Sequence, residues 1–287
     1  MNGDLLKHIE EKMPSFSKGQ KRIATYILEQ YDKAAYLTAS KLSEIVGVSE
    51  STVVRFAIEL GFEGYPDFQH SLQSLMRNRL TSFQRMEVSN QLMGEGNVLG
   101  KVLLSDAERI RRTLEITNSV SFDRAIEEIV KADNIYILGV RSSSYLAGFL
   151  NYYLRMIFDR VRLLQSTSGS ELFEQLLPLH KGDTVIAISF PRYSKSVIHG
   201  VEFAKGRQVN VIALTDSTQS PLAPLADQLL VAQSDMASFV DSLVAPMSII
   251  NAMIVALSRR KQEELDRRLR ELEDVWDRYD VYDKKSI

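Results

Sequence analysis

The sequence contains no cysteine among its 287 residues. This absence excludes disulfides, thiolate zinc sites, iron–sulfur clusters and cysteine nucleophiles, and it agrees with a reducing compartment. The chain also lacks an excess of charge of either sign, because 35 Lys and Arg stand against 37 Asp and Glu, for a net charge of -2. Binding to nucleic acid or to an anionic membrane therefore requires a local patch of basic residues.

Long apolar runs and the common enzyme motifs are missing as well. The most apolar stretch, residues 239–257, is interrupted by Asp241, Pro246 and Asn251, so it predicts a buried helix rather than a membrane span. The N-terminus has no apolar signal-peptide core, and we expect a soluble cytoplasmic protein without membrane association. Phosphate-binding glycine motifs and G-x-S-x-G are absent. The four histidines show no metal-ligand spacing, so we expect no cofactor and no metal.

The pattern along the chain predicts two domains. The N-terminal part has helical periodicity, whereas short apolar strands alternate with helices from residue 119 onward, as in a parallel sheet covered by helices on both faces. Between them, polar residues 86–97 hold two glycines and predict a linker. The C-terminal tail predicts an amphipathic helix that either lies on its own domain or packs on a partner subunit. We therefore expect a helical domain, a linker with a connecting helix, an α/β domain and a C-terminal helix at residues 1–85, 86–118, 119–258 and 259–287.

A helix-turn-helix pattern lies between residues 39 and 60. The first helix, 39–46, is expected to turn Leu42, Ile45 and Val46 inward and to end at Gly47 in a left-handed conformation. The second helix begins after Ser49, a good N-cap residue.

This second helix carries the residues suited to DNA. Ser51 and Thr52 stand in its first turn, and Arg55 follows one turn later. Hydroxyls at a helix N-terminus can meet phosphates and base edges, and an Arg can reach guanine. Residues 1–85 carry 11 Lys and Arg against 10 Asp and Glu, so the basic patch has to be local.

Residues 49–68 repeat a family-specific pattern. Ser49, Thr52, Val53, Arg55 and Phe56 fit Ser-x-x-Thr-Val-x-Arg-Phe, and residues 60–68 fit Leu-Gly-Phe-x-Gly-Tyr-x-x-Phe. The segment thereby resembles the helix-turn-helix of the RpiR family of bacterial transcription regulators. One departure is Gln69, where a basic residue often stands, which weakens one backbone contact. The resemblance implies double-stranded operator DNA as a partner, and we expect the contacts at Lys21, Lys41, Ser49, Ser51, Thr52, Arg55 and Tyr65.

Three polar turns follow predicted strands of the α/β half. The first strand ends at Gly139, followed by Arg141, Ser142 and Ser143, the third ends at Ser189, followed by Arg192 and Ser194, and the fourth leads to Asp216. Carboxyl ends of parallel strands share one edge of the sheet, where ligands bind, and helix N-termini there favour anions. Each Ser alone fits a simple N-cap, but three such turns at one edge favour a binding site.

Residues 119–258 resemble the SIS (sugar isomerase) domain, the usual partner of the RpiR helix-turn-helix. Its loops read Gly-x-Gly-x-Ser and Ser-x-Ser-Gly-x-Thr, and the chain keeps Gly139, Ser143, Ser189 and a hydroxyl at Ser194. The resemblance implies a three-layer α/β fold with a parallel sheet. The chain departs from the pattern because Pro191 replaces the middle Ser, and Arg141 and Arg192 replace two glycines.

Both lost glycines are thus arginines, planar donors suited to phosphate or carboxylate. We expect a small anionic effector, either a phosphosugar or a carboxylate, in a site made of Gly139, Arg141, Ser142, Ser143, Ser189, Arg192, Ser194 and Asp216. The alternative is that each Arg pairs with a neighbouring acid or with the partner subunit.

These features predict a DNA-binding transcriptional regulator, not an enzyme, whose operator binding is controlled by the effector. One short recognition helix reads few base pairs, so we expect a homodimer or a dimer of dimers on a palindrome. The alternative function is a phosphosugar aldose–ketose isomerase, which needs a general base, for which the candidates are Glu171, Glu174, His180 and His199. A third hypothesis is a metabolite-binding adaptor that does not contact DNA.

Overall fold

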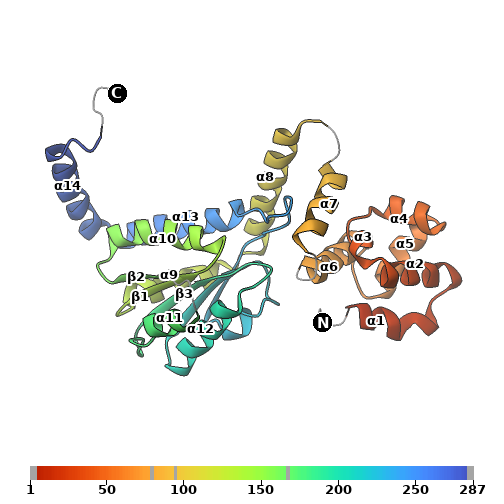
Figure 1. Ribbon diagram of the computed structural model, residues 1–287, viewed down its shortest axis with the longest axis horizontal. Helices are drawn as coiled ribbons and strands as arrows, with labels where there is room; N and C mark the ends of the chain where they lie inside the picture. The colour runs from red at the N-terminus through yellow and green to blue at the C-terminus, as the bar shows by residue number, and fades with distance from the viewer. Residues whose placement is uncertain (1–4, 78–80, 94–95, 166–168, 283–287) are drawn as a thin grey trace. The chain divides into compact units, whose positions relative to one another are not determined.

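The computed structural model describes residues 5–77, 81–93, 96–165 and 169–282 (Figure 1). It forms two compact units. The first comprises residues 1–103 together with 235–242, and the second comprises residues 104–234 and 243–287. Helix α7 (Ser82–Met93) extends through most of residues 86–97, the stretch expected to be a linker.

The N-terminal part of the first unit is helical over the residues that the structure describes. Its helices are α1 (Leu5–Lys12), α2 (Lys18–Glu29), α3 (Tyr31–Ala34), α4 (Ala39–Val46), α5 (Glu50–Glu59), α6 (Tyr65–Arg77) and α7, with a 3-10 turn at Met13–Ser15. The core is centred on Phe56, whose ring centroid lies 5.1 Å from that of Phe16 and 5.7 Å from that of Phe68. All three rings are buried, so α5 is fixed in the middle of the unit.

Local signals in the sequence explain where these helices begin and end. Ser17 and Gln20 form a reciprocal capping box at the start of α2. Thr38 accepts a hydrogen bond from the amide of Lys41 at the start of α4, and Gly47 ends α4 with φ 67°. The inward position expected for Ile45 is wrong: this side chain is 46% exposed, because the core side of α4 is occupied by its neighbours on the helix.

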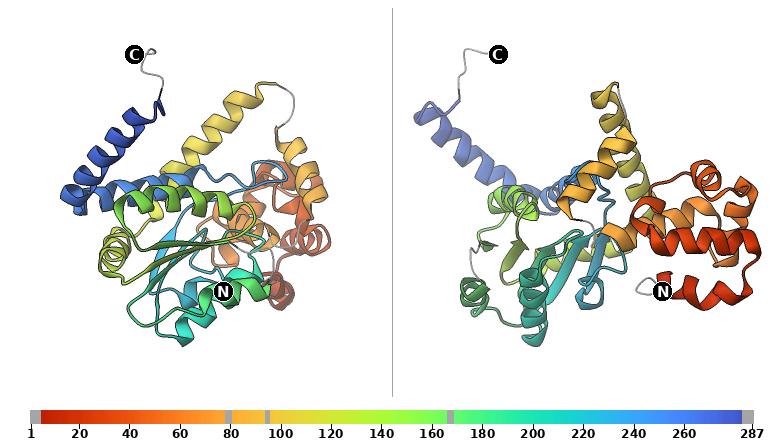
Figure 2. Two further views of the ribbon diagram at one scale, coloured as in Figure 1. Left: turned by 60° about the vertical axis from the view of Figure 1, so that its left-hand side comes forward. Right: turned by 45° about the vertical axis from the view of Figure 1, so that its right-hand side comes forward.

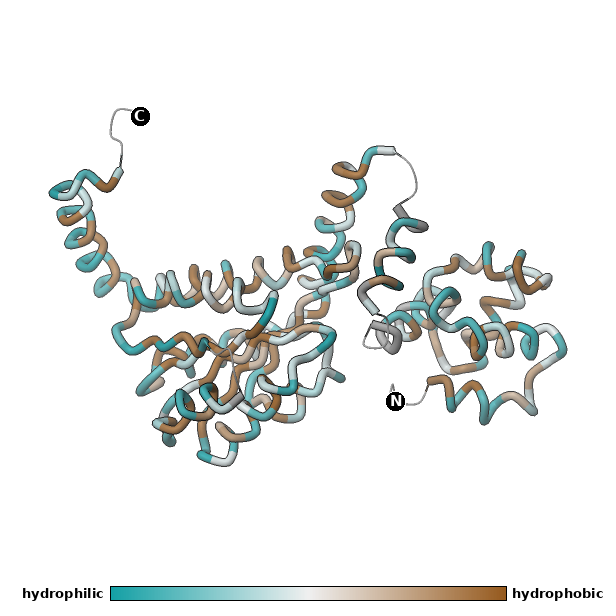
Figure 3. Tube along the Cα trace, viewed as in Figure 1, coloured by the Kyte–Doolittle hydropathy of each residue, from teal (hydrophilic) through white to brown (hydrophobic). Residues whose placement is uncertain are grey.

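The second unit contains a parallel five-stranded sheet in the order β2-β1-β3-β4-β5. Its strands are β1 (Ile135–Gly139), β2 (Val161–Leu164), β3 (Thr184–Ile188), β4 (Asn210–Thr215) and β5 (Gln228–Val231). The three central strands β1, β3 and β4 are buried almost throughout, which explains their continuous apolar sequences. Figure 3 shows these strands as brown segments.

Helices cover both faces of this sheet. They are α9 (Ser119–Lys131), α10 (Ser143–Ile157), α11 (Gly169–Leu176), α12 (Lys195–Gly206) and α13 (Val244–Arg260). Side chains of α9, α10 and α13 share one buried cluster with Ile135 and Ile137. Side chains of α11 and α12 share another with Tyr136 and Leu138. The alternation along β1 thus separates two helix layers with the sheet between them (Figure 2), which confirms the three-layer α/β architecture.

Two further helices complete the second unit. Helix α8 (Val98–Ile116) begins in the first unit and continues into the second. Helix α14 (Gln262–Arg278) is attached to the end of α10, because Arg268 donates hydrogen bonds to the carbonyls of Arg155 and Met156 and pairs with Asp159 at 2.6 Å. Within the residues that the structure describes, every helix is too short or too polar to span a membrane.

Candidate DNA-binding and effector sites

One face of α5 is turned to solvent at the start of the helix. Val53, Phe56 and Ala57 are buried on the other face, so Ser51 and Arg55 face outward. The Arg55 guanidinium donates to the carbonyl and to the hydroxyl of Ser51, both at 3.3 Å. These contacts within the helix hold the Arg against its own first turn, where a recognition helix meets DNA.

Three hydroxyls cluster at the N-terminus of α5. The Ser49 hydroxyl lies 2.9 Å from that of Ser51 and 2.8 Å from that of Thr52. Ser49 occupies the N-cap position, yet its side chain accepts no backbone amide. The structure therefore brings Ser49, Ser51, Thr52 and Arg55 together at a helix N-terminus, an arrangement that suits a phosphate.

The start of α2 packs beside this cluster. A Cβ on Gly19 would lie 3.2 Å from the Thr52 methyl group, so glycine permits the close approach of α2 to α5. Arg22 donates to the carbonyl of Gly47 at 3.1 Å and thereby holds the turn between α4 and α5. A groove along α2 is lined by Lys18, Lys21, Arg22, Thr25, Tyr26, Glu29 and Val46.

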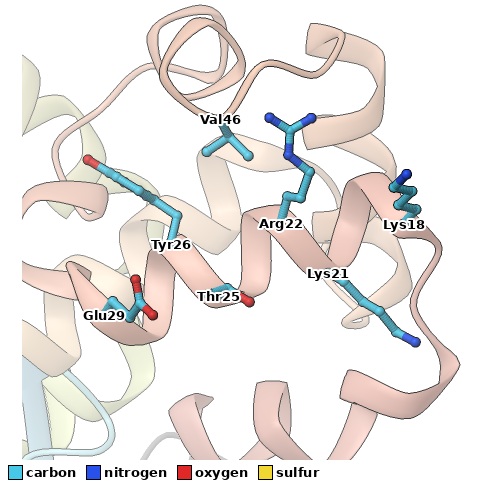
Figure 4. A pocket seen from close by; sticks show the side chains of 7 residues that line it. All are labelled: Lys18, Lys21, Arg22, Thr25, Tyr26, Glu29 and Val46. Carbon is cyan, nitrogen blue, oxygen red and sulfur yellow. The ribbon is translucent and has the colours of Figure 1, made fainter.

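Two predicted contact residues lie outside the α5 cluster. Figure 4 shows Lys21 leaving α2 on a different side from Arg22. Lys41 is exposed but forms an ion pair with Glu44 at 2.8 Å, one turn along α4. Lys18, like Lys41, fits an ordinary solvated position from the sequence alone. Its place at the start of α2, next to the Gly19 that approaches Thr52, makes it a better neighbour of the cluster than Lys41.

Tyr65 does not lie on this face, and the expectation that it contacts DNA is corrected. The side chain is 3% exposed, and its hydroxyl donates to the carbonyl of Leu37 at 2.7 Å. Burial raises the pKa of the Tyr65 hydroxyl above its usual value, so the group stays a neutral donor. Tyr65 thus joins the start of α6 to the segment before α4, which is a structural role.

The second candidate site lies at the carboxyl edge of the sheet. Strands β1 and β3 are neighbours, with Gly139 paired to Ile188, while the chain continues from them to β2 on one side and β4 on the other. Such a reversal of strand order is where open α/β sheets bind ligands. The turns that carry Arg141 and Arg192 leave this point side by side. Strand order cannot be read from the sequence, so the adjacency of the Arg141 and Arg192 turns is shown only by the structure.

Both arginines have a backbone conformation that favours glycine. The φ angle is 56° at Arg141 and 63° at Arg192, in the left-handed region where a side chain costs energy. The fold has therefore kept the glycine conformation of both loops while the residue is arginine. Backbone strain of this kind gathers at functional sites, and both side chains are exposed at the edge.

The two helices that follow these turns begin without side-chain caps. Ser142 stands at the N-cap of α10 and Ser194 at the N-cap of α12, and neither hydroxyl accepts a bond from the helix amides. The N-cap interpretation of these serines is thus not supported. Ser143 and Ser189 are buried beside them.

Gly139 has a packing role. A Cβ there would lie 2.7 Å from the carbonyl oxygen of Ser143 and 3.0 Å from the Cβ of Ala147. Glycine therefore lets α10 approach the end of β1 and brings its N-terminus to the edge of the sheet.

A buried carboxylate completes this edge. Asp216 accepts hydrogen bonds from the hydroxyl of Tyr193 at 2.6 Å and from that of Thr215 at 3.2 Å. Tyr193 lies between Arg192 and Ser194, and no pattern in the sequence indicated a role for it. Guanidinium groups, hydroxyls and one acceptor carboxylate together suit an anion that also carries hydroxyl groups.

Of the candidate bases of the isomerase hypothesis, the two histidines lie away from this edge, whereas Glu171 stands in the first turn of α11, which follows β2 at the same edge, and Glu174 follows it along the helix. His180 precedes β3, at the opposite end of the strand, where its Nδ1 lies 3.0 Å from the carbonyl of Lys181. His199 lies within α12, beyond its first turn. Among the described residues, no group of three or more acidic or histidine side chains is placed to hold a metal ion.

Comparison with known proteins matches two family models to the chain, one for each unit. Residues 3–79 match the family model for a helix-turn-helix domain of the rpiR family, and residues 128–256 match the SIS domain. An uncharacterized HTH-type transcriptional regulator of Caldanaerobacter subterraneus is 25% identical over 282 residues, covering 95% of this chain and 96% of that protein.

Two solved structures resemble the fold. The sugar isomerase domain of an RpiR transcription factor from Sphaerobacter thermophilus is 29% identical, with a TM-score of 0.59, and covers 62% of this chain and 99% of that one. The NanR protein of Vibrio vulnificus, in complex with ManNAc-6P, is 24% identical, with a TM-score of 0.58, and covers 95% of this chain and 97% of that one. With a helix-turn-helix of the rpiR type in front of a SIS domain, the chain belongs to the RpiR family of transcriptional regulators.

Proposed function

We propose that the chain binds operator DNA through α5 and that a small anion bound at the carboxyl edge of the sheet controls this binding. The observation that carries the proposal is the exposed Ser51–Arg55 face, joined to the hydroxyl cluster at the start of the same helix. We assign DNA binding to residues 1–85 and effector binding to 119–258, with 86–118 connecting them and 259–287 as a C-terminal helix. Operator binding implies that the protein acts in the cytoplasm.

The chemistry of the edge favours a phosphosugar as effector. Arg141 and Arg192 supply cationic forks for a phosphate, and Asp216 supplies an acceptor for sugar hydroxyls. A carboxylate without hydroxyl groups would leave Asp216 facing an anion, which costs energy. The ligand of the Vibrio NanR structure, ManNAc-6P, is a phosphosugar. This supports phosphosugars as the class of effector, without identifying which phosphosugar this chain binds.

We propose a regulatory rather than an enzymatic use of this edge. Isomerisation needs a base within reach of the substrate; His180 lies at the opposite end of the sheet, whereas Glu171 lies at the effector edge. The preference for regulation therefore rests on the relatives and on the first unit. The relatives with curated names are regulators. The first unit would have no role in an isomerase.

The working form is a homodimer, and α8 supports this assignment. Its buried residues are Arg109 and Thr113, whereas Leu103, Ile110 and Leu114 are 59%, 40% and 80% exposed. Spacings of seven and four residues place these three on one stripe. The charged side of α8 is neutralised internally, because Arg111 and Arg112 bond Glu108 and lower its pKa to about 2. A second copy would cover the apolar stripe, which Figure 3 shows as brown turns.

Charges on the stripe are expected to separate the dimer. Leu103→Glu combined with Leu114→Glu should give monomers at micromolar concentration in sedimentation equilibrium, because two buried carboxylates would face apolar surface. Leu104→Glu is the matched control, since the helical repeat places Leu104 about 100° from Leu103. A dimer that survives the double change would contradict the role of α8.

The proposed function is tested by selection of genomic DNA fragments with the full chain. We expect at least one fragment to be retained specifically, with log affinity falling linearly as log salt rises. Addition of a panel of sugar phosphates, ManNAc-6P among them, should change the affinity for that fragment. If no fragment is enriched with or without the panel, the regulator assignment is wrong and the isomerase hypothesis returns.

A further inference from the structure

The loop between β5 and α13 groups with the first unit although it comes late in the chain. Residues 235–242 cluster with residues 1–103. The loop is closed by its own hydrogen bonds, from the amide of Ser242 to the carbonyl of Asp235 at 3.0 Å and from that of Ala237 to Val240 at 3.0 Å. An antiparallel bridge joins Met236 to Asp241. We call residues 235–242 the β5–α13 loop.

Helix α7 holds this loop by side chains that are themselves buried. Arg85 forms an ion pair with Asp241 and donates to the carbonyl of Phe239 at 3.5 Å, and it is 3% exposed. The Ser89 hydroxyl, one turn further along α7, donates to the carbonyl of Ala237 at 3.1 Å. A buried ion pair fixes one register between its two segments, because any other register leaves a charge without its partner.

The residues just before the loop are attached inside the second unit. Ala232 donates to the carbonyl of Thr215 at 2.8 Å, and Thr215 directly precedes Asp216 of the effector edge. Gln233 donates its amide to the hydroxyl of Thr113 on α8 at 2.9 Å. A single residue, the fully buried Ser234, separates Gln233 from the loop.

We propose that the β5–α13 loop couples the effector turn to α7. The path is short: the carbonyl of Thr215 accepts a hydrogen bond from the amide of Ala232, and three residues later the chain enters the loop that Arg85 and Ser89 hold. A ligand that shifts the Asp216 turn therefore also changes the position of the β5–α13 loop. The Arg85–Asp241 pair gives the contact an intact and a broken arrangement, as a coupling element requires. This inference rests on the proposed function.

The test uses operator DNA as the probe, because coupling between two sites is reciprocal and the effector then need not be known. In the full chain, hydrogen exchange of residues 232–242 is measured with and without the retained DNA fragment. The unaltered protein should show exchange slowed about five-fold or more by DNA, the lower end of common coupling strengths. Arg85→Met combined with Asp241→Leu should bind the fragment yet lose this change.

Removing both charges together avoids an unpaired buried charge, so this variant is expected to fold. Arg268→Met combined with Asp159→Leu removes a different, more exposed ion pair, between α14 and the segment that follows α10, and should behave as the unaltered protein does. Ser89→Ala, which removes one neutral hydrogen bond, should reduce the effect in part.

If DNA binds but leaves the exchange of residues 232–242 unchanged, the coupling role is wrong while the proposed function stands. Retention of the full effect in the Arg85 and Asp241 variant would overturn it equally. Absence of DNA binding by the unaltered protein would contradict the proposed function itself and this inference with it.

Discussion

Arg55→Ala is expected to weaken operator binding about 30-fold or more. A well-placed Arg contributes about 1–3 kcal/mol to base discrimination, and a dimer carries two copies, so the loss is at least about 2 kcal/mol. The bonds from Arg55 to the Ser51 carbonyl and hydroxyl already hold the guanidinium near the helix start. Little conformational entropy is then lost on binding, which keeps the contribution of Arg55 high.

Two controls separate this contact from general electrostatics. Arg55→Lys keeps the charge and loses the planar fork, so it should retain non-specific DNA binding and lose preference for the operator. Arg160→Ala removes an equal charge from the second unit, where Arg160 bonds the carbonyl of Val130, and should leave the operator affinity unchanged. The measurement is fluorescence anisotropy with operator and scrambled DNA. Equal affinities of the Arg55→Ala and unaltered proteins would exclude α5 as the reading helix.

Replacement of Arg141 or Arg192 by glycine is expected to lower the affinity for the effector without lowering the stability of the fold. Loss of a charge-assisted hydrogen bond costs about 1.5–3 kcal/mol, so each change should weaken binding of the effective sugar phosphate at least about ten-fold. Arg141→Gly and Arg192→Gly should nevertheless be no less stable than the unaltered protein, because glycine relieves the left-handed strain and its extra unfolded-state entropy offsets only part of that gain. Alanine at either position loses the affinity and keeps the strain.

Gln208→Gly is the matched control for this pair. Gln208 has φ 59°, nearly that of both arginines, but it precedes β4 and thus lies at the opposite end of the sheet. Its replacement should change stability as the arginine changes do, without affecting the affinity for the ligand. Isothermal titration and thermal unfolding measure the two quantities. Full affinity in both Arg→Gly variants would mean that the arginines do not hold the anion.

The fold was predictable where the sequence pattern is local. The strands predicted to end near Gly139, Ser189 and Asp216 and the helix from Ala39 to Val46 were confirmed, because strands buried on both faces have continuous apolar sequences and Gly47 marks the end of the helix. Strand order and the adjacency of the Arg141 and Arg192 turns arise from pairing between distant segments, which no local pattern encodes. The same holds for Tyr65, whose bond partner Leu37 lies 28 residues away.

The candidate sites divide in the same way. Arg55 and the hydroxyls around Ser49 were predicted as DNA contacts because their positions at the start of the helix turn them outward. Arg141 and Arg192 were found through departures from a family pattern, but their left-handed backbone required coordinates. Tyr193 and Arg85 were missed, because the role of each depends on a partner far along the chain. The partner of Tyr193 is Asp216, and that of Arg85 is Asp241.

The late position of the β5–α13 loop has a consequence for biosynthesis. Helical units are rich in local contacts, which form quickly, so the helices of residues 5–77 can assemble as soon as they leave the ribosome. Arg85 then has no Asp241 to pair with until about 150 more residues are synthesised, which takes roughly 10–30 seconds at about 5–20 residues per second. During those seconds Arg85 on α7 has not yet met Asp241, the acid that neutralises its charge. The first unit therefore reaches its final form only when synthesis of the sheet is nearly complete. The order of synthesis thus means that the first unit is completed only after the effector-binding sheet of the second unit has been made.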